Sequence, residues 1–482
     1  MKNENKTNEN PYDLLIRNAV ILPSFEDGSM IRDGVIGIRD GVIALLEPKD
    51  PSCIYQAKEE IDAEGMLAIP GFVNTHVHCF QSLLKGLGAD QPLIGWLNSS
   101  VQPFGVRVTH REQELATWIA CLEAIKSGCT TLSEFFYTNQ DPELADVCIE
   151  TMRKTGIRSV FMRTFQDFGQ EYNTPECYIE PVEKAIGEVD RLRKTYLRES
   201  IMKVPSVKAP SESDTSMNED MLSIWTGPDV TWATTKHGYE AILEYCMDQN
   251  VHYTMHLKET PEDDAMCRRH YGKGIVELLD EIGFLTDRFL AVHCVYLTEQ
   301  EIKLLSERGV SISHNPAANL YLGSGIAPIP KALAAGINLS LGTDGAASNN
   351  TTDMMDTIRL TALIHKGVSR DATAMSAEKV LRVATIGGAK ALGMENAIGS
   401  LELGKKADIV LFDTGELRSM PMHDPAATIV YSGSGENIDT TIVNGKVVYR
   451  RGVFSCGMDE KELEERVRDW IKTDHGLGRM RK

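Results

Sequence analysis

The middle of the 482-residue chain alternates short apolar runs with longer helical segments, and this alternation restricts the fold more than any other feature. One helix signal is LTEQEIKLLSERG, which begins with a capping box formed by Thr298 and Glu301 and stops at Gly309. Strands that alternate with helices over such a length predict an α/β architecture with a parallel sheet. The runs that we expect to form strands are LAIPGFVNTH, TTLSEFF, SVFMRTF, VHYTMHL, FLAVHCV, VSISHN and INLSLGTD.

The alternating region, residues 69–395, is somewhat longer than the roughly 250 residues typical of a (β/α)8 barrel. We therefore expect a TIM-type barrel, and a doubly wound open sheet is the alternative that periodicity leaves open. Residues from about Tyr172 to Trp232 fit the alternation poorly, so we expect an inserted loop there.

The two ends of the chain share a different pattern, in which β-branched strands are separated by tight turns. Asp-Gly pairs interrupt LLIRNAVILPSFEDGSMIRDGVIGIRDGVIALLEP, and Asn444-Gly445 interrupts TTIVNGKVVYRRGVF. Because isolated hairpins are marginally stable, one small β-sandwich module built from residues 1–68 and 396–456 is favoured over two unrelated surface hairpins. Residues 457–482 contain DEKELEERVRDWIKT, which predicts a terminal amphipathic helix followed by a tail.

The charge balance and the cysteines restrict the partners and the compartment. The chain has 50 Lys+Arg and 69 Asp+Glu, a net charge of −19, whereas nucleic acids and anionic membranes are bound by basic surfaces. The ten cysteines are scattered without a C-x-x-C pair, and the opening MKNENKTNENPYD has no apolar segment typical of a secretory signal. We therefore expect a reduced, cytoplasmic protein that binds neither nucleic acid nor membrane.

The motif PGFVNTHVH places two histidines, His76 and His78, at the end of an apolar strand. Side chains at positions i and i+2 of a strand point to the same side, so both imidazoles can reach one point. Two converging ring nitrogens supply half of a zinc or iron site.

Three further polar residues follow apolar runs in the same way. His256 lies late in VHYTMHL, His293 lies late in FLAVHCV, and Asp344 ends INLSLGTD. Because the carboxyl ends of barrel strands meet at one mouth, we expect these side chains to form a site with His76 and His78. A fourth residue, Glu259, could move a proton between a water and a leaving group, but its acidic surroundings KETPEDD are equally typical of a surface loop.

Together the motifs resemble those of the amidohydrolase superfamily. They are PGFVNTHVH, HLKE, AVHCVYL, SHNPAANLYLGSGIAPIP, GTDGAASNN and IGSLELGKKADIVLFD, in this order along nearly the whole chain. Within the superfamily they resemble the branch of S-adenosylhomocysteine/methylthioadenosine deaminases, guanine deaminase and the triazine hydrolases. The resemblance implies a (β/α)8 barrel with one catalytic divalent metal ion, zinc or alternatively iron, and a β module formed by both chain ends.

The resemblance also implies a role for each candidate site residue. Glu259 would shuttle protons, His293 would polarise the substituent of the attacked carbon or orient the water, and Asp344 would act as a base. The implied reaction is attack of water on an electron-poor ring carbon, followed by departure of ammonia after protonation by Glu259. The implied metal ligands are His76, His78, His256 and Asp344.

The resemblance to the nucleoside-acting members is weaker at two places. Those members carry a glutamate soon after their W-L and Pro segment, where it would hold ribose hydroxyls, whereas WLNSSVQPFGVR has Phe104 and Gly105. They also have Gly-Pro-His ahead of the fifth strand, where this chain has Gly227-Pro228-Asp229. Both departures favour a free base, a pterin or a triazine-like ring as substrate.

Five residues are candidates for substrate contacts. Gln81 could hydrogen-bond a ring nitrogen, and Trp96 and Phe135 could stack on a flat heterocycle, although core packing is the commoner role of such rings. Arg163 would either face the pocket or pair with an acid. Asn319 would either position the substrate or cap a turn.

We therefore expect a metal-dependent aminohydrolase that releases ammonia from a purine base, a pterin or a triazine-like ring. The alternatives are a triazine-type chlorohydrolase or N-dealkylating hydrolase, and an S-adenosylhomocysteine/methylthioadenosine deaminase. A non-enzymatic barrel is disfavoured because the candidate site residues are all in place. The partner would be a small heterocycle, and the resemblance implies a homo-oligomer, a dimer or larger.

Overall fold

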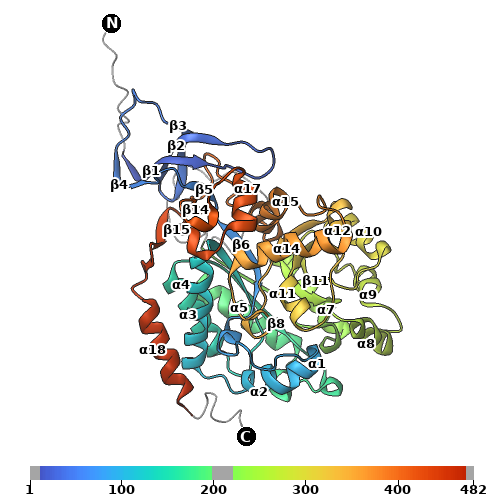
Figure 1. The fold of residues 1–482 in the computed structure, drawn as a ribbon. Helices are drawn as coiled ribbons and strands as arrows, with labels where there is room; N and C mark the ends of the chain where they lie inside the picture. The colour runs from blue at the N-terminus through green and yellow to red at the C-terminus, as the bar shows by residue number, and fades with distance from the viewer. Residues whose placement is uncertain (1–10, 198–220, 474–482) are drawn as a thin grey trace.

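The computed structural model describes residues 11–197 and 221–473, which form a closed barrel and a second sheet (Figure 1). Eight strands pair in parallel around the whole barrel, which confirms the predicted TIM-type fold and contradicts the open doubly wound sheet. The barrel strands are β6 (Phe72–Val77), β7 (Cys129–Phe136), β8 (Arg158–Phe165), β9 (Leu222–Pro228), β10 (Tyr253–Leu257), β11 (Phe289–His293), β12 (Ser311–His314) and β13 (Asn338–Leu341).

The fourth barrel strand, β9, lies inside the stretch that the sequence predicts to be an inserted loop. β9 pairs with β8 from Ser159↔Leu222 to Phe165↔Pro228, and its other neighbour is β10. The same stretch contains helix α5 (Val182–Tyr196), so it is not a loop throughout. Residues 198–220, between them, lie outside the described residues.

Helices pack around the barrel, as Figure 1 shows, and several begin at caps that the sequence encodes. The predicted capping box of Thr298 and Glu301 is present at the start of α10, and Thr109 and Glu112 form another at α3. The longer helices are α3 (His110–Lys126), α4 (Glu143–Thr155), α5, α7 (Lys236–Asp248), α8 (Pro261–Tyr271), α9 (Ile275–Glu281), α10 (Glu299–Glu307), α14 (Met354–Ser369) and α18 (Glu460–Ile471). The shorter ones are α1 (Leu93–Trp96), α2 (Gln102–Gly105), α11 (Pro316–Tyr321), α12 (Ile329–Ala334), α13 (Ala346–Asn349), α15 (Ala377–Arg382), α16 (Gly388–Ala391) and α17 (Pro425–Ala427).

The strands of both chain ends form one nine-stranded sheet beside the barrel (Figure 1). The two halves meet where β14 pairs antiparallel with β5, and apolar side chains from both halves, such as Ile36 and Ile409, share one buried cluster. Asp40-Gly41 and Asn444-Gly445 are hairpin turns, as predicted. The strands are β1 (Tyr12–Ile21), β2 (Ile31–Arg39), β3 (Val42–Pro48), β4 (Ala57–Asp62), β5 (Leu67–Pro70), β14 (Ile409–Phe412), β15 (Ile438–Val443), β16 (Lys446–Arg450) and β17 (Val453–Phe454).

A single residue, Gly71, separates the two sheets, so the predicted strand LAIPGFVNTH is divided between them. A Cβ atom at Gly71 would overlap the side chain of Thr130, which leaves room only for glycine. Across the same junction, Arg158 of β8 forms a bidentate pair with Asp408, with N–O distances of 2.9 and 3.0 Å. Both side chains are buried, so this ion pair ties the barrel to the chain-end sheet.

The predicted terminal amphipathic helix is α18, which packs on α3. Its buried Trp470 donates from Nε1 to Oε1 of Glu112 at 2.9 Å. All ten cysteines lie in the described part of the chain and are present as thiols outside any disulfide. Within residues 11–197 and 221–473, no helix is both long enough and apolar enough to cross a membrane.

Candidate active site

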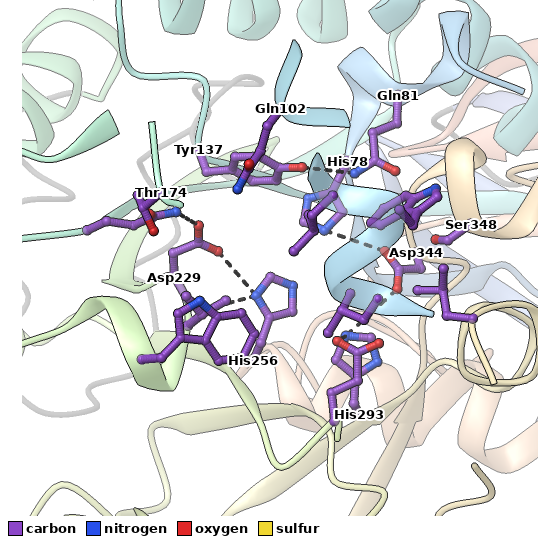
Figure 2. Close-up of a pocket in the computed structure, with 18 of the residues that line it drawn as sticks. His78, Gln81, Gln102, Tyr137, Thr174, Asp229, His256, His293, Asp344 and Ser348 are labelled. Atoms are coloured by element: carbon purple, nitrogen blue, oxygen red, sulfur yellow. Dashed lines mark hydrogen bonds and ion pairs between the residues drawn. The ribbon is translucent and has the colours of Figure 1, made fainter. Parts of the chain in front are cut away.

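The candidate residues converge at the carboxyl end of the barrel, where Figure 2 shows His78, His256, His293 and Asp344 around one pocket. They belong to, or directly follow, strands β6, β10, β11 and β13, which barrel closure places around one mouth. The backbone is left-handed at His293 (φ 71°) and Asp344 (φ 64°), a conformation that is uncommon for non-glycine residues and occurs in turns and at functional sites. The converging residues are His76, His78, His256, Glu259, His293 and Asp344.

The site residues form two overlapping groups of three, and within each group the possible ligand atoms all lie within 4.8 Å of one another. One consists of His76, His256 and His293, and the other of His76, His78 and Asp344. The carboxylate Oδ1 of Asp344 lies 3.4 Å from Nε2 of His78 and 3.6 Å from Nε2 of His76. Nitrogen and carboxylate ligands at this spacing suit a zinc-like divalent ion.

Hydrogen bonds fix the tautomers of two of the histidines. Nδ1 of His78 lies 2.7 Å from the carbonyl oxygen of Phe135, and Nδ1 of His256 lies 2.8 Å from that of Asp229. Because a carbonyl oxygen only accepts, each Nδ1 carries a proton, and in the neutral ring each Nε2 keeps its lone pair. This arrangement is typical of metal-binding histidines.

His293 has the opposite tautomer. The amide nitrogen of Asn319 lies 3.0 Å from Nδ1 of His293, and since an amide NH2 group donates, Nδ1 accepts and the proton sits on Nε2. That Nε2 lies 3.6 Å from Oε2 of Glu259 and 3.8 Å from Oδ2 of Asp344. His293 therefore presents a donor to the pocket, which distinguishes it from the histidines with a free Nε2 lone pair.

The buried ring of His76 provides the test for a metal ion. Neither of its nitrogens has a hydrogen-bond partner among the described residues, and such buried polar atoms cost about 1–3 kcal/mol each. Burial lowers the pKa of His76 well below its usual value, so the ring is neutral and offers a lone pair. A cation bound by His76, His78, His256 and Asp344 would satisfy this ring, so the residues present fit a metal ion.

Glu259 is buried beside the same point, with 6% of its surface exposed, so the structure contradicts a surface-loop role. Its Oε1 accepts a hydrogen bond of 3.2 Å from Ser324. Burial, reinforced by the charge of Asp344, raises the pKa of Glu259 to about 8. A carboxyl group in this environment can hold a proton at neutral pH and donate it.

The pocket itself extends from the histidines to the side chains of Trp96 and Gln81. Gln81 donates from Nε2 to the hydroxyl of Tyr137 at 3.0 Å, and its Oε1 has no partner among the described residues. Trp96 and Gln81 are therefore placed where the sequence predicts substrate contacts.

Three predicted substrate contacts lie outside the pocket wall. The ring of Phe135 packs 4.2 Å from that of His256, and Asn319 contacts the far side of His293. Arg163 forms a buried ion pair with Glu180, which agrees with the alternative that it pairs with an acid and not with a substrate contact. These residues support the site from behind and do not line the pocket.

The sequence analysis missed several pocket residues. Asp229 directly follows β9, a strand that the sequence pattern does not predict. Its position at the end of a barrel strand could therefore not be recognised from the sequence. Tyr137 stands one residue beyond β7, where the rule that polar residues follow barrel strands would have found it. Gln166 and Tyr178 lie in the connection after β8, where only Gln166 directly follows a strand.

Comparison with known proteins agrees with this geometry. The family model described as "Amidohydrolase family" matches residues 67–448. A 5-methylthioadenosine/S-adenosylhomocysteine deaminase of Syntrophobacter fumaroxidans is 31% identical over 463 residues, which cover 96% of this chain and 98% of that protein. Relatives of this kind agree with the expected deaminase class and with the alternative of an S-adenosylhomocysteine/methylthioadenosine deaminase.

Solved structures share the fold. An adenosine deaminase from Xanthomonas campestris with bound zinc superposes with a TM-score of 0.85 at 29% identity, covering 98% of this chain and 99% of its own. The atrazine chlorohydrolase of Arthrobacter aurescens, complexed with zinc, gives a TM-score of 0.83 at 25% identity, covering 95% and 100%. Because the family model matches most of its 482 residues, this chain belongs to the amidohydrolase family.

Proposed function

We propose that this chain is a single-metal deaminase that hydrolyses the exocyclic amino group of an adenosine-type heterocycle and releases ammonia. The observation that carries the proposal is that the histidines on the two sides of the site have different tautomers. His78 and His256 present Nε2 lone pairs, whereas His293 presents an N–H beside Glu259. One side of the site can therefore hold a cation, and the other side can move protons.

The ligands in this proposal are His76, His78, His256 and Asp344, with zinc favoured over iron because imidazole and carboxylate are the usual zinc donors. When bound, the ion makes water a nucleophile at neutral pH. Asp344, through Oδ2, is placed to accept a proton, and His293 is placed to donate a hydrogen bond from Nε2 to the substrate. Glu259 then delivers a proton to the leaving amino nitrogen, which departs as ammonia.

The adenosine-type ring is supported by the names of the sequence relatives, which are deaminases of methylthioadenosine and S-adenosylhomocysteine. Hydrolysis of a triazine-like ring is the second candidate, supported by the atrazine chlorohydrolase neighbour and by the departures at Gly105 and Asp229.

We also propose that the enzyme acts in the reduced cytoplasm as a homo-oligomer, and that residues 69–395 form its catalytic domain. The reduced state is supported by its ten cysteines, which are all present as thiols outside any disulfide.

Metal analysis and an ammonia assay test the proposal together. Purified protein should contain about one equivalent of zinc or iron, and it should release ammonia from at least one of adenosine, methylthioadenosine, guanine, pterin or melamine. Chloride release from chlorotriazines without ammonia release from this panel would favour the second candidate. Protein that binds no metal ion stoichiometrically would contradict both.

A further inference from the structure

The pocket contains a polar wall that the proposed reaction does not use. It is formed by Gln166, Tyr178 and Asp229, which lie beyond the carboxyl ends of β8 and β9. All three line the pocket and are buried, with at most 8% of their surface exposed. We call these three residues the polar wall.

Two atoms of the polar wall lack partners. The hydroxyl of Tyr178 and Oε1 of Gln166 are buried and make no hydrogen bond within the described residues. Nε2 of Gln166 donates to Oδ2 of Asp229, which fixes the amide so that its Oε1 remains available as an acceptor. Buried polar atoms without partners are costly, so their position in a ligand pocket indicates that a ligand satisfies them.

The position of the Tyr178 hydroxyl requires the absence of a side chain at Gly105 of helix α2. A Cβ atom at Gly105 would overlap this hydroxyl, whereas Cζ of Tyr178 would be 3.6 Å away and Cε2 of Phe80 3.4 Å away. Gly105 is also the position where the sequence departs from the glutamate of nucleoside-acting enzymes. The hydroxyl therefore occupies space that any larger residue at this position would need.

The polar wall extends from the metal centre, where Oδ1 of Asp229 lies 3.2 Å from Nδ1 of His256, to Tyr178. The ring of Tyr137 lies 5.0 Å from that of His78 and 6.2 Å from that of Tyr178, so Tyr137 separates the metal ligands from the Tyr178 hydroxyl. A heterocycle whose reacting carbon sits at the histidines would place a substituent, rather than the reacting carbon, near Tyr178.

The charges around the pocket restrict that substituent. Asp229, Glu259 and Asp344 line the pocket, and no lysine or arginine of the described residues does. The Asp229 carboxylate and the unpaired amide oxygen of Gln166 accept hydrogen bonds from O–H and N–H groups, whereas a phosphate would find no lysine or arginine in the pocket lining to pair with. The wall therefore suits an uncharged substituent that carries hydroxyl groups.

We propose that Tyr178, together with Gln166 and Asp229, forms a subsite that binds an uncharged, hydroxyl-bearing substituent of the heterocycle and excludes a phosphorylated one. This inference rests on the proposed function, because it assumes that the ring lies at the metal centre. Tyr178 acts here as a specificity-determining residue that takes no part in proton transfer.

Binding measurements on the zinc-loaded Glu259→Gln enzyme test the subsite without turnover. Isothermal titration calorimetry would compare adenosine, adenine and adenosine monophosphate, with and without Tyr178→Phe. We expect Tyr178→Phe to weaken adenosine binding about five- to tenfold, the value of one hydrogen bond, and to change adenine binding less than twofold. The monophosphate should bind at least about a hundredfold more weakly than adenosine, the discrimination that about 2.8 kcal/mol would give.

A double-mutant cycle separates the subsite from a structural role. Gly105→Ala should weaken adenosine binding as Tyr178→Phe does, but it should have little further effect in the Tyr178→Phe background, where the overlapping hydroxyl is gone. Tyr253→Phe is the matched control, because this hydroxyl is bound to Phe284 and Thr286 away from the pocket, and adenosine affinity should not change.

Three results would overturn the subsite. They are equal losses for adenine and adenosine, additive effects of the two substitutions, and a monophosphate that binds as tightly as adenosine. A failure of the proposed function is distinguishable, since it would appear as absence of ammonia release by the wild-type enzyme while the binding ratios still decide the subsite.

Discussion

The amide nitrogen of Asn319 lies 3.0 Å from Nδ1 of His293, and this contact sets which nitrogen of the imidazole faces the pocket as a donor. The backbone carbonyls of Phe135 and Asp229 set the opposite tautomer in His78 and His256. Side chains of the same type thus acquire different roles from what their Nδ1 atoms contact.

Replacing Asn319 should therefore impair turnover without removing the metal ion. Asn319→Ala removes the hydrogen bond that keeps Nδ1 of His293 unprotonated, so both tautomers become accessible. The substitution should lower kcat about 10- to 100-fold, as is typical of residues that orient an active-site histidine. Asn319→Asp should cost more, because its carboxylate only accepts and would draw the proton to Nδ1. Nitrogen-15 NMR of labelled histidine would report the tautomer, and metal analysis the occupancy.

The control for this experiment is Asn338→Ala, which removes amide hydrogen bonds to Ser311 and Gly387 outside the pocket. Its kcat should stay within about twofold of the wild type. An unchanged kcat in both Asn319 variants would show that the tautomer of His293 does not matter for the reaction.

Glu259→Gln should separate metal binding from proton transfer. The substitution keeps the size of the side chain and its contact with Ser324, but glutamine cannot deliver a proton. We expect metal content to be unchanged and kcat to fall about 10²- to 10⁴-fold, the usual contribution of a general acid. Single-turnover ammonia release would measure the loss, and a decrease below tenfold would remove Glu259 from the mechanism.

Much of the site could be predicted from the sequence because it obeys a local rule. His76, His256 and His293 lie at the ends of apolar runs, and closure of a parallel barrel brings strand ends together whatever the loops do. Arg163 also lies near the end of a strand, yet it pairs with Glu180, an acid from the following connection that no local pattern identifies.

The remaining pocket residues depend on contacts between distant segments. Tyr178 lines the pocket because Gly105, 73 positions earlier, leaves space for its hydroxyl, and hydrophobic periodicity carries no information about such a pair. Similarly, β9 ends in Gly227-Pro228, which is a turn signal by composition, although the closed barrel pairs it as a strand.

The ion pair of Arg158 and Asp408 should contribute strongly to stability. Removing one partner of a buried pair leaves an uncompensated charge, so Arg158→Ala should lower the free energy of unfolding by about 3–5 kcal/mol. The matched control is Arg191→Ala, which breaks a similar bidentate pair with Asp146 that is partly exposed and should cost about 0–1 kcal/mol. Urea denaturation would compare them, and equal losses would contradict the role of the junction.

Asp353 caps helix α14 by accepting a hydrogen bond from the backbone N–H of Met355. Burial, with the charge of Asp356, raises the pKa of Asp353 to about 6. The folded state therefore binds this proton more tightly than the unfolded state, so its contribution to stability is present at pH 4 and is lost as the pH rises through about 6.

Asp353→Asn should remove this loss, because asparagine caps a helix about as well as aspartate but does not ionise. The full pKa shift corresponds to about 3 kcal/mol, and partial solvent exposure of the side chain reduces the expected gain at pH 7.5 to about 1–2 kcal/mol. The advantage of the variant should disappear near pH 4, where both residues are uncharged. Urea denaturation at both pH values would measure it, and a gain independent of pH would show that the ionisation of Asp353 is not its cause.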